Sequence, residues 1–168
     1  TLDAGYAACE AVTRDKAKSF HFASAFLPAA KRRGVYALYD FCRHVDDLVD
    51  ERGSRPVSAV HADLAVLAAM VRGLEAGKVP ADPRWAPFAD TILRHEVPIG
   101  PLLELIDGVG GDLEPRAFQE TEELLRYCHQ VAGVVGLALG PLLGARKTGF
   151  EEAGAALGAA MQLTNVLR

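Results

Sequence analysis

The sequence has few cysteines, few aromatic residues and no run of basic residues longer than Lys31-Arg32-Arg33. Its three cysteines lie far apart and match neither a zinc-site spacing nor a disulfide framework, so we expect a reducing compartment. The net charge is −4 and no basic stripe is present, which argues against a nucleic acid as partner.

A targeting signal and a long apolar run are also missing. No basic-then-apolar pattern opens the chain. The longest nearly apolar run, Val131 to Leu143, is too short and too rich in glycine to span a bilayer. We therefore expect a cytoplasmic protein, at most peripheral to the inner face of a membrane. No GxGxxG fingerprint occurs, so the sequence favours the absence of a dinucleotide cofactor such as NADPH. The oligomeric state stays open.

Alternation with a period of two, the signal of a half-buried strand, is absent as well. Proline, N-cap and glycine signals instead divide the chain into helical segments with short connections. We predict one all-α domain over residues 1–168. The expected helices are 2–19, 28–51, 56–75, 82–94, 100–111, 121–139 and 149 to the end, the last opened by a capping box from Thr148 to Glu151.

The most informative segment is the acidic end of the second expected helix. Asp46 and Asp50 are four residues apart and share one helix face, which Arg43 and Tyr39 extend. Acids at this end oppose the helix dipole, and like charges one turn apart repel. These unfavourable interactions are not compensated within the helix, and this indicates a functional site that a bound cation would complete. A solvated acidic helix end is the simpler alternative.

Two later segments each allow two interpretations. A stripe of small residues at helical spacing near Tyr127 and Val131 fits either close helix packing or a groove for an apolar ligand; its members are Gly133, Gly136 and Gly140. Gln162 and Asn165 share a face of the last helix. Asn165 can offer a neutral oxygen to a hard cation, although an amide pair is more often a polar surface feature.

Five segments in order resemble the squalene/phytoene synthase family of head-to-head prenyl diphosphate synthases, and the resemblance extends over essentially the whole chain. They are Ala17–Phe20, Cys42–Asp50, Leu105–Leu113, Tyr127–Gly136 and Gln162–Arg168. The resemblance implies an isoprenoid synthase-type bundle around an apolar cavity, where two Mg²⁺-bound prenyl diphosphates meet. Mn²⁺ can stand in for Mg²⁺ in such chemistry.

The resemblance also implies roles for individual residues. Asp46 and Asp50 match metal ligands of the first aspartate motif, and Asn165 matches a ligand associated with the second. The residues that match positions near the diphosphates or the reacting carbons are Ser19, Arg43, Tyr127, Gln162 and Arg168. Those that match substrate-cavity lining are Phe20, Phe22, Tyr39 and Val131.

Two departures from the family pattern bear on these expectations. The second aspartate motif, expected just past Arg168, is absent, so we expect the chain to be the N-terminal part of a longer protein. Gly110-Gly111 replaces a bulky apolar residue that members often carry, which affects the local shape of the cavity.

The resemblance favours coupling of geranylgeranyl diphosphate to phytoene through a cyclopropylcarbinyl diphosphate. The alternatives are squalene or dehydrosqualene formation from farnesyl diphosphate and a non-catalytic helical assembly factor. Asp46-Asp47-x-x-Asp50 also fits the DDxxD motif of head-to-tail prenyltransferases and terpene cyclases.

Overall fold

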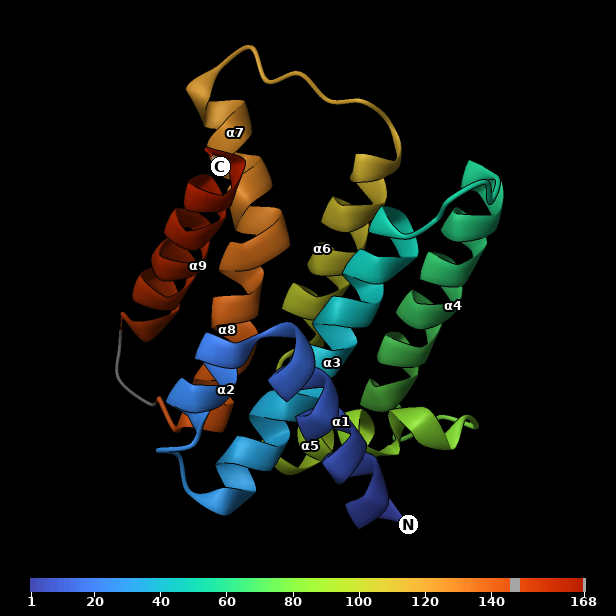
Figure 1. The fold of residues 1–168 in the computed structure, drawn as a ribbon, viewed down its shortest axis with the longest axis vertical. Coiled ribbons are helices and arrows are strands. Elements are labelled where there is room, and N and C mark those ends of the chain that lie inside the picture. The colour runs from blue at the N-terminus through green and yellow to red at the C-terminus, as the bar shows by residue number, and fades with distance from the viewer. Residues whose placement is uncertain (146–148, 168) are drawn as a thin grey trace.

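The computed structural model describes residues 1–145 and 149–167, and within these ranges the chain forms helices and no strand (Figure 1). In chain order the α-helices are α1 (Leu2–Lys16), α2 (Lys18–Ser24), α3 (Ala29–Asp50), α4 (Val57–Glu75), α5 (Ala86–Arg94), α6 (Ile99–Gly110), α7 (Thr121–Cys128), α8 (Val134–Leu143) and α9 (Phe150–Val166). Short 3₁₀ turns, η1 (Pro83–Trp85) and η2 (Gly111–Leu113), precede α5 and follow α6. The all-α prediction is confirmed.

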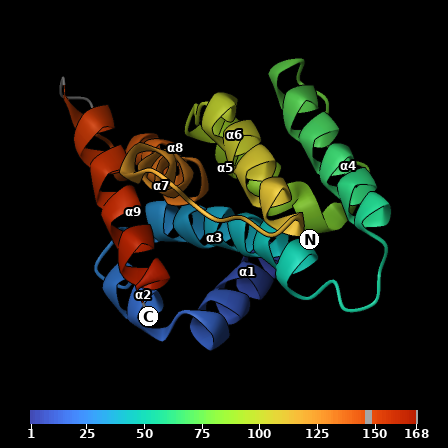
Figure 2. The same cartoon turned by 90° about the horizontal axis from the view of Figure 1, so that it is seen from above.

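Helix α3 is the central element of the bundle. In Figure 2 it lies between a row formed by α9, α8, α6 and α4 and the N-terminal helices α1 and α2. It forms here because Pro28 can occupy the position before the first helical residue and because no proline or glycine follows except the buried Gly34. Gly53, with φ 55°, follows the end of the helix, as the sequence indicated.

The buried face of α3 is the centre of the hydrophobic core. Phe41 is fully buried, and its ring stacks on that of Phe88 from α5 with the centroids 4.1 Å apart. Trp85 closes the same cluster edge-on, 5.8 Å from Phe41. The other core residues of α3 follow at helical spacing: Val35, Leu38, Val45 and Val49. This packing holds the opposite face of α3, which carries the acids, in place.

Two predicted boundaries are wrong. The first expected helix is broken at Ala17, whose backbone (φ −140°, ψ 66°) leaves the helical region, so α1 and α2 are separate. The helix expected to end near 139 continues to Leu143 and ends at Gly144 in the left-handed conformation. Asp82 is an N-cap as predicted, since its side chain accepts from the backbone N–H of Arg84 at 2.9 Å. The capping box at Thr148 lies outside the described residues.

Helices α7 and α8 form one continuous rod. They are joined by a π-helical turn, η3 (His129–Gly133), which widens the backbone where α7 would otherwise run directly into α8. Such π-turns inside α-helices are frequent at functional sites.

Helix α4 is long and apolar enough to cross a membrane by length and composition alone. A core helix of a soluble protein passes the same test. Six residues of α4, among them Val60, Leu64 and Val71, are buried against the rest of the fold. The prediction that no segment spans a membrane rested on the shorter apolar run from Val131 to Leu143.

Candidate functional site

The acidic end of α3 combines burial with crowded negative charge. Asp46 lies one turn beyond Cys42 and one turn before the exposed Asp50. Burial, together with the neighbouring charges of Asp50, Asp47 and Asp112, raises the pKa of the Asp46 carboxyl to about 7, against the lowering effect of Arg43. The ionised form of this carboxyl is therefore unfavourable in the free protein, which suits a site where a bound cation would stabilise the carboxylate.

Arg43 is paired within its own helix. Its guanidinium forms an ion pair with Asp47, one turn further on, and lies 3.9 Å from the carboxylate of Glu51. The Nε atom of Arg43 is buried and makes no hydrogen bond with any of the residues that the structure describes. Arg43 therefore has hydrogen-bonding capacity left for an anion.

Asp112 adds a carboxyl from a second element, the turn η2 that follows α6. The Tyr127 hydroxyl at the end of α7 donates to Asp112 Oδ2 at 2.9 Å. Burial raises the pKa of Asp112, and the charge of Asp50 acts in the same direction, while the bond from Tyr127 lowers it. Burial, with the Asp112 carboxylate next, raises the pKa of Tyr127 to about 12, so this hydroxyl stays protonated at neutral pH.

An apolar cavity of ≈ 560 Å³ adjoins these groups. Its walls come from α2, α3, η3, α8 and α9, and nearly all of its lining is aliphatic or aromatic. Five of the residues predicted to contact substrate line it together: Phe20, Tyr39, Val131, Gln162 and Asn165. Tyr39 and Cys42 of α3 also line the cavity, and they lie one helical turn before Arg43 and Asp46, respectively.

Glycines allow α9 to approach the η3–α8 rod closely enough to form one wall of the cavity. A methyl group at Gly136 would lie 2.1 Å from the carbonyl oxygen of Gly154, and one at Gly158 would lie 2.2 Å from that of Ala132. At Gly140 it would meet the ring of Phe150. Gly136, Gly154 and Gly158 also line the cavity. The glycine stripe therefore serves close packing and the apolar groove at once.

The predicted amide pair of α9 faces the cavity and connects it to Tyr127. Asn165 donates through its side-chain nitrogen to Gln162 Oε1 at 3.3 Å, and this leaves its carbonyl oxygen outside that bond. Gln162 lies beside the Tyr127 hydroxyl. The polar groups thus form a connected series from Asn165 through Gln162 and Tyr127 to Asp112.

Three predicted residues are not brought into this arrangement. The expectation that Phe22 lines the cavity is wrong for this structure: its side chain is 68% exposed and packs edge-on against Phe26, because α2 turns that face outward. Ser19 is exposed in the first turn of α2, although its neighbour Phe20 lines the cavity and stacks on Tyr39. Arg168 lies outside the described residues.

Asp112 was not among the predicted site residues, although it lies in a segment that carried the family resemblance. Its partner Tyr127 is fifteen residues away, and no periodic pattern connects a turn with the end of the next helix. The only local signal was the Gly110-Gly111 pair before it, which indicated a change of backbone direction.

The carboxylates of this region fit a divalent cation that receives only some of its ligands from the protein. Among residues 1–145 and 149–167, no three His, Cys, Asp or Glu side chains come together as an enclosed metal site. Mg²⁺ does not need one, since it is commonly held by one or two carboxylates with water and substrate phosphates completing the shell. Asp46 and Asp50, on one helix face, offer such a partial set.

Comparison with known proteins agrees with this geometry. The family model for squalene/phytoene synthase matches residues 13–168. A 15-cis-phytoene synthase of Synechococcus elongatus is 34% identical over the whole chain, which covers 58% of that protein. A 4,4'-diapophytoene synthase of Staphylococcus haemolyticus is 35% identical, again over the whole chain and 59% of the relative.

The solved structures give the same result for the fold. The crystal structure of a dehydrosqualene synthase superposes with a TM-score of 0.89 at 34% identity, over 99% of this chain and 56% of the other. A squalene synthase of Alicyclobacillus acidocaldarius gives 0.85 at 28% identity, over 98% of this chain and 60% of that one. The chain thus spans somewhat more than half the length of these relatives.

Proposed function

Because the chain belongs to the squalene/phytoene synthase family, we propose that it carries the first aspartate motif and much of the cavity of a Mg²⁺-dependent prenyltransferase. The reaction is the head-to-head joining of two prenyl diphosphates. The observation that supports it most directly is the position of the apolar cavity, one helical turn from the half-buried carboxyl of Asp46.

The acids of α3 have the first task in this reaction. Asp46 and Asp50 would hold Mg²⁺, with the side-chain oxygen of Asn165 as a further ligand, and a bound Mg²⁺ neutralises the charge of a diphosphate leaving group. Arg43 would bind diphosphate oxygens with the donors that Asp47 and Glu51 do not satisfy. Both interactions favour ionisation of the allylic C–O bond.

The cavity has the second task. Loss of diphosphate leaves an allylic carbocation, which water would quench, so an apolar lining such as Phe20, Tyr39 and Val131 protects it. The double bond of the second molecule attacks this cation, and loss of a proton gives a cyclopropylcarbinyl diphosphate. The second diphosphate then leaves, and the resulting cation rearranges. Loss of a proton gives phytoene or dehydrosqualene, whereas hydride from NADPH would give squalene.

The names of the relatives favour geranylgeranyl diphosphate as substrate and phytoene as product, since phytoene synthases of cyanobacteria and plants are 34–35% identical to this chain. Farnesyl diphosphate is the alternative, because a diapophytoene synthase and a dehydrosqualene synthase are equally similar. The two substrates differ in length, so the depth of the cavity decides between them.

The experiment is a product assay on the purified protein as its gene encodes it. Farnesyl and geranylgeranyl diphosphate are supplied separately with Mg²⁺, with and without NADPH, and the extracted lipid is identified by mass. A C40 hydrocarbon from geranylgeranyl diphosphate without NADPH supports phytoene synthesis. A C30 product assigns the farnesyl branch, and dependence on NADPH separates squalene from dehydrosqualene.

A folded protein that forms no coupled product from either substrate would contradict the proposal. That result would leave a helical assembly factor as the function. A cyclic or linear terpene made from one substrate molecule would instead indicate a terpene synthase, the other activity compatible with Asp46-Asp47-x-x-Asp50.

A further inference from the structure

Asp112 and Tyr127 join two parts of the fold that the chain connects only through the long loop after η2. Tyr127 is the penultimate residue of α7, directly before the buried Cys128 and the π-helical turn η3. Its hydroxyl donates to Asp112 Oδ2 at 2.9 Å across that loop. The position of the hydroxyl is therefore tied to the end of α6 as well as to its own helix.

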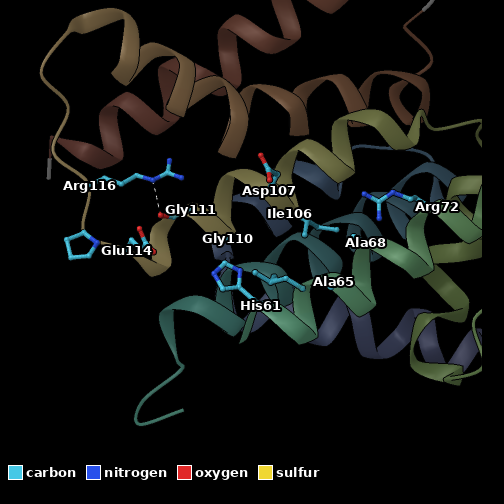
Figure 3. A pocket seen from close by; sticks show the side chains of 12 residues that line it. His61, Ala65, Ala68, Arg72, Ile106, Asp107, Gly110, Gly111, Glu114 and Arg116 are labelled. Carbon is cyan, nitrogen blue, oxygen red and sulfur yellow. Dashed lines mark hydrogen bonds between the residues drawn. The ribbon is translucent and has the colours of Figure 1, made fainter. Parts of the chain in front are cut away.

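Arg116 holds Asp112 in turn. Its Nε donates to the carbonyl oxygen of Gly111 at 2.9 Å and lies 3.8 Å from Asp112 Oδ1. Figure 3 shows this side chain beside Gly111, at one end of a second cavity between α4 and α6. A methyl group at position 111 would lie 1.2 Å from the Arg116 guanidinium, so Arg116 would have to leave this position if residue 111 carried a side chain.

The ring of Tyr127 is held by the same loop. The Arg116 guanidinium carbon is 5.5 Å from the ring centroid, a cation–π distance, and the Phe118 ring is 5.1 Å away at a tilt of 38°. With the hydroxyl bound to Asp112, these contacts leave the ring little freedom to rotate. The loop thus fixes both ends of the Tyr127 side chain.

We infer that Asp112, held by Arg116, is a positioning residue that fixes the Tyr127 hydroxyl and takes up its only proton donation. The oxygen is then left as an acceptor beside Gln162, which is one of the residues that line the cavity. The consequence for catalysis rests on the proposed function: Tyr127 presents an electron-rich oxygen to cationic carbon and does not donate a proton to the leaving diphosphate.

The test uses tyrosine labelled with ¹³C at the hydroxyl-bearing carbon, whose NMR shift reports hydrogen bonding. The chain has four tyrosines, and Tyr127→Phe identifies the relevant resonance by its loss. We expect Asp112→Ala to move the Tyr127 resonance and Asp112→Asn to leave it near the wild-type position, because an amide oxygen still accepts. Asp107→Ala, an exposed acid on the adjacent helix α6, is the matched control and leaves it unmoved.

An unmoved Tyr127 resonance in Asp112→Ala would overturn the inference. The other three tyrosine resonances report whether the variant is folded. If Asp112→Ala does not fold, Arg116→Ala replaces it, and the same shift or a broadening of the Tyr127 signal is expected. This measurement needs no substrate, so it tests the positioning even if the proposed function fails.

A double-mutant cycle then tests the link to function, with the affinity for a farnesyl ammonium ion, a mimic of the allylic cation, in Mg²⁺ and inorganic diphosphate as readout. We expect Asp112→Ala to weaken binding about fivefold in the wild type, since the Tyr127 oxygen is no longer held toward the positive charge, and less than about twofold in Tyr127→Phe. Equal losses in both backgrounds, with an altered Mg²⁺ requirement, would make Asp112 a metal ligand and overturn the inference. No binding by the wild type would count against the proposed function alone.

Discussion

Helices α3 and α9 line the same cavity but are held in different ways. α3 has eight buried residues and packs on five other α-helices in addition to α1. None of the described residues of α9 is buried, and Leu157 and Met161 are more than 60% exposed. α3 is fixed by side-chain packing, whereas α9 is fixed by close backbone contact at glycines.

The difference shows that α3, rather than α9, can tolerate side chains that repel one another. The acids of α3 repel one another at the negative end of the helix dipole, and the core on the opposite face of the same helix compensates for that repulsion. α9 has no buried core face to compensate for such repulsion, and the polar groups that it presents to the cavity are a neutral amide pair. Substitutions in the two helices should therefore separate function from stability.

The largest expected effect is on function at α3. Asp46→Asn should lower Mg²⁺-dependent turnover by about a hundredfold or more, because a carboxylate that holds the metal against the diphosphate is lost. The free energy of unfolding without metal should stay the same or rise, since repulsion is relieved. Asp50→Asn should behave alike. Product formation and urea denaturation measure the two effects.

Asp63→Asn on α4, which removes a half-exposed carboxylate paired with Arg55, is the control for these variants. Its turnover should match the wild type. A marked loss of folding in metal-free Asp46→Asn would contradict the assignment of Asp46 to a metal site and return it to a structural role.

The next effect is on stability at α9. Gly136→Ala should lower the free energy of unfolding by about 1–3 kcal/mol, because its methyl group meets backbone atoms of Gly154 that cannot move independently. Hydrogen exchange should show that the amides of α9 lose protection while those of α3 keep theirs.

Gly100→Ala in α6 is the matched control, since a methyl group there meets open space. It should be neutral or stabilising, as alanine is the better helix former. If Gly136→Ala were equally harmless, the close approach of α8 and α9 would not be what holds α9.

The sequence carried the information for α3 more fully than that for α9. The period of a single helix places Tyr39, Arg43, Asp46 and Asp50 on one face, and the cavity that Tyr39 helps to line lies beside that face. The glycine stripe could serve helix packing or an apolar groove, and its role depends on contacts with Gly154 and Gly158 in another helix. The periodicity of one helix could not decide between the two.

The wrong prediction for Phe22 and the unpredicted role of Asp112 also come from contacts between elements. Phe22 was placed in the cavity by resemblance, but the break at Ala17 sets α2 apart from α1 and leaves this ring exposed. The bond between Asp112 and Tyr127 depends on how a loop folds back, which no local propensity describes. Contacts between elements, rather than the elements themselves, are what the sequence did not reveal.

A smaller functional effect is expected at Arg43. Arg43→Lys should reduce turnover about tenfold, because an ammonium cannot replace the guanidinium fork that binds two diphosphate oxygens. Arg94→Lys on α5, an exposed arginine paired with Asp90, should leave turnover unchanged. Turnover near that of the wild type in Arg43→Lys would remove this residue from the diphosphate site.

A further effect is the dependence of stability on pH. The pKa of Asp46 is raised from 3.8 to about 7 in the folded protein, so between these values the folded state binds more protons than the unfolded state. The contribution of this group is therefore complete below about pH 4 and is lost as the pH rises to about 7, with a slope of at most about 1.4 kcal/mol per pH unit.

Other groups titrate in the same window, and His44 acts in the opposite sense. Burial lowers the pKa of His44, so its contribution to stability is lost as the pH falls. The difference between wild type and Asp46→Asn cancels such terms, and it should favour the wild type at pH 4 relative to pH 7 in metal-free urea denaturation. Saturating Mg²⁺ should reduce this difference, because a cation favours the ionised carboxylate in the folded state. A difference independent of pH would show that Asp46 ionises as freely in the folded protein as in the unfolded chain, and α3 would then carry no stored repulsion for a metal to relieve.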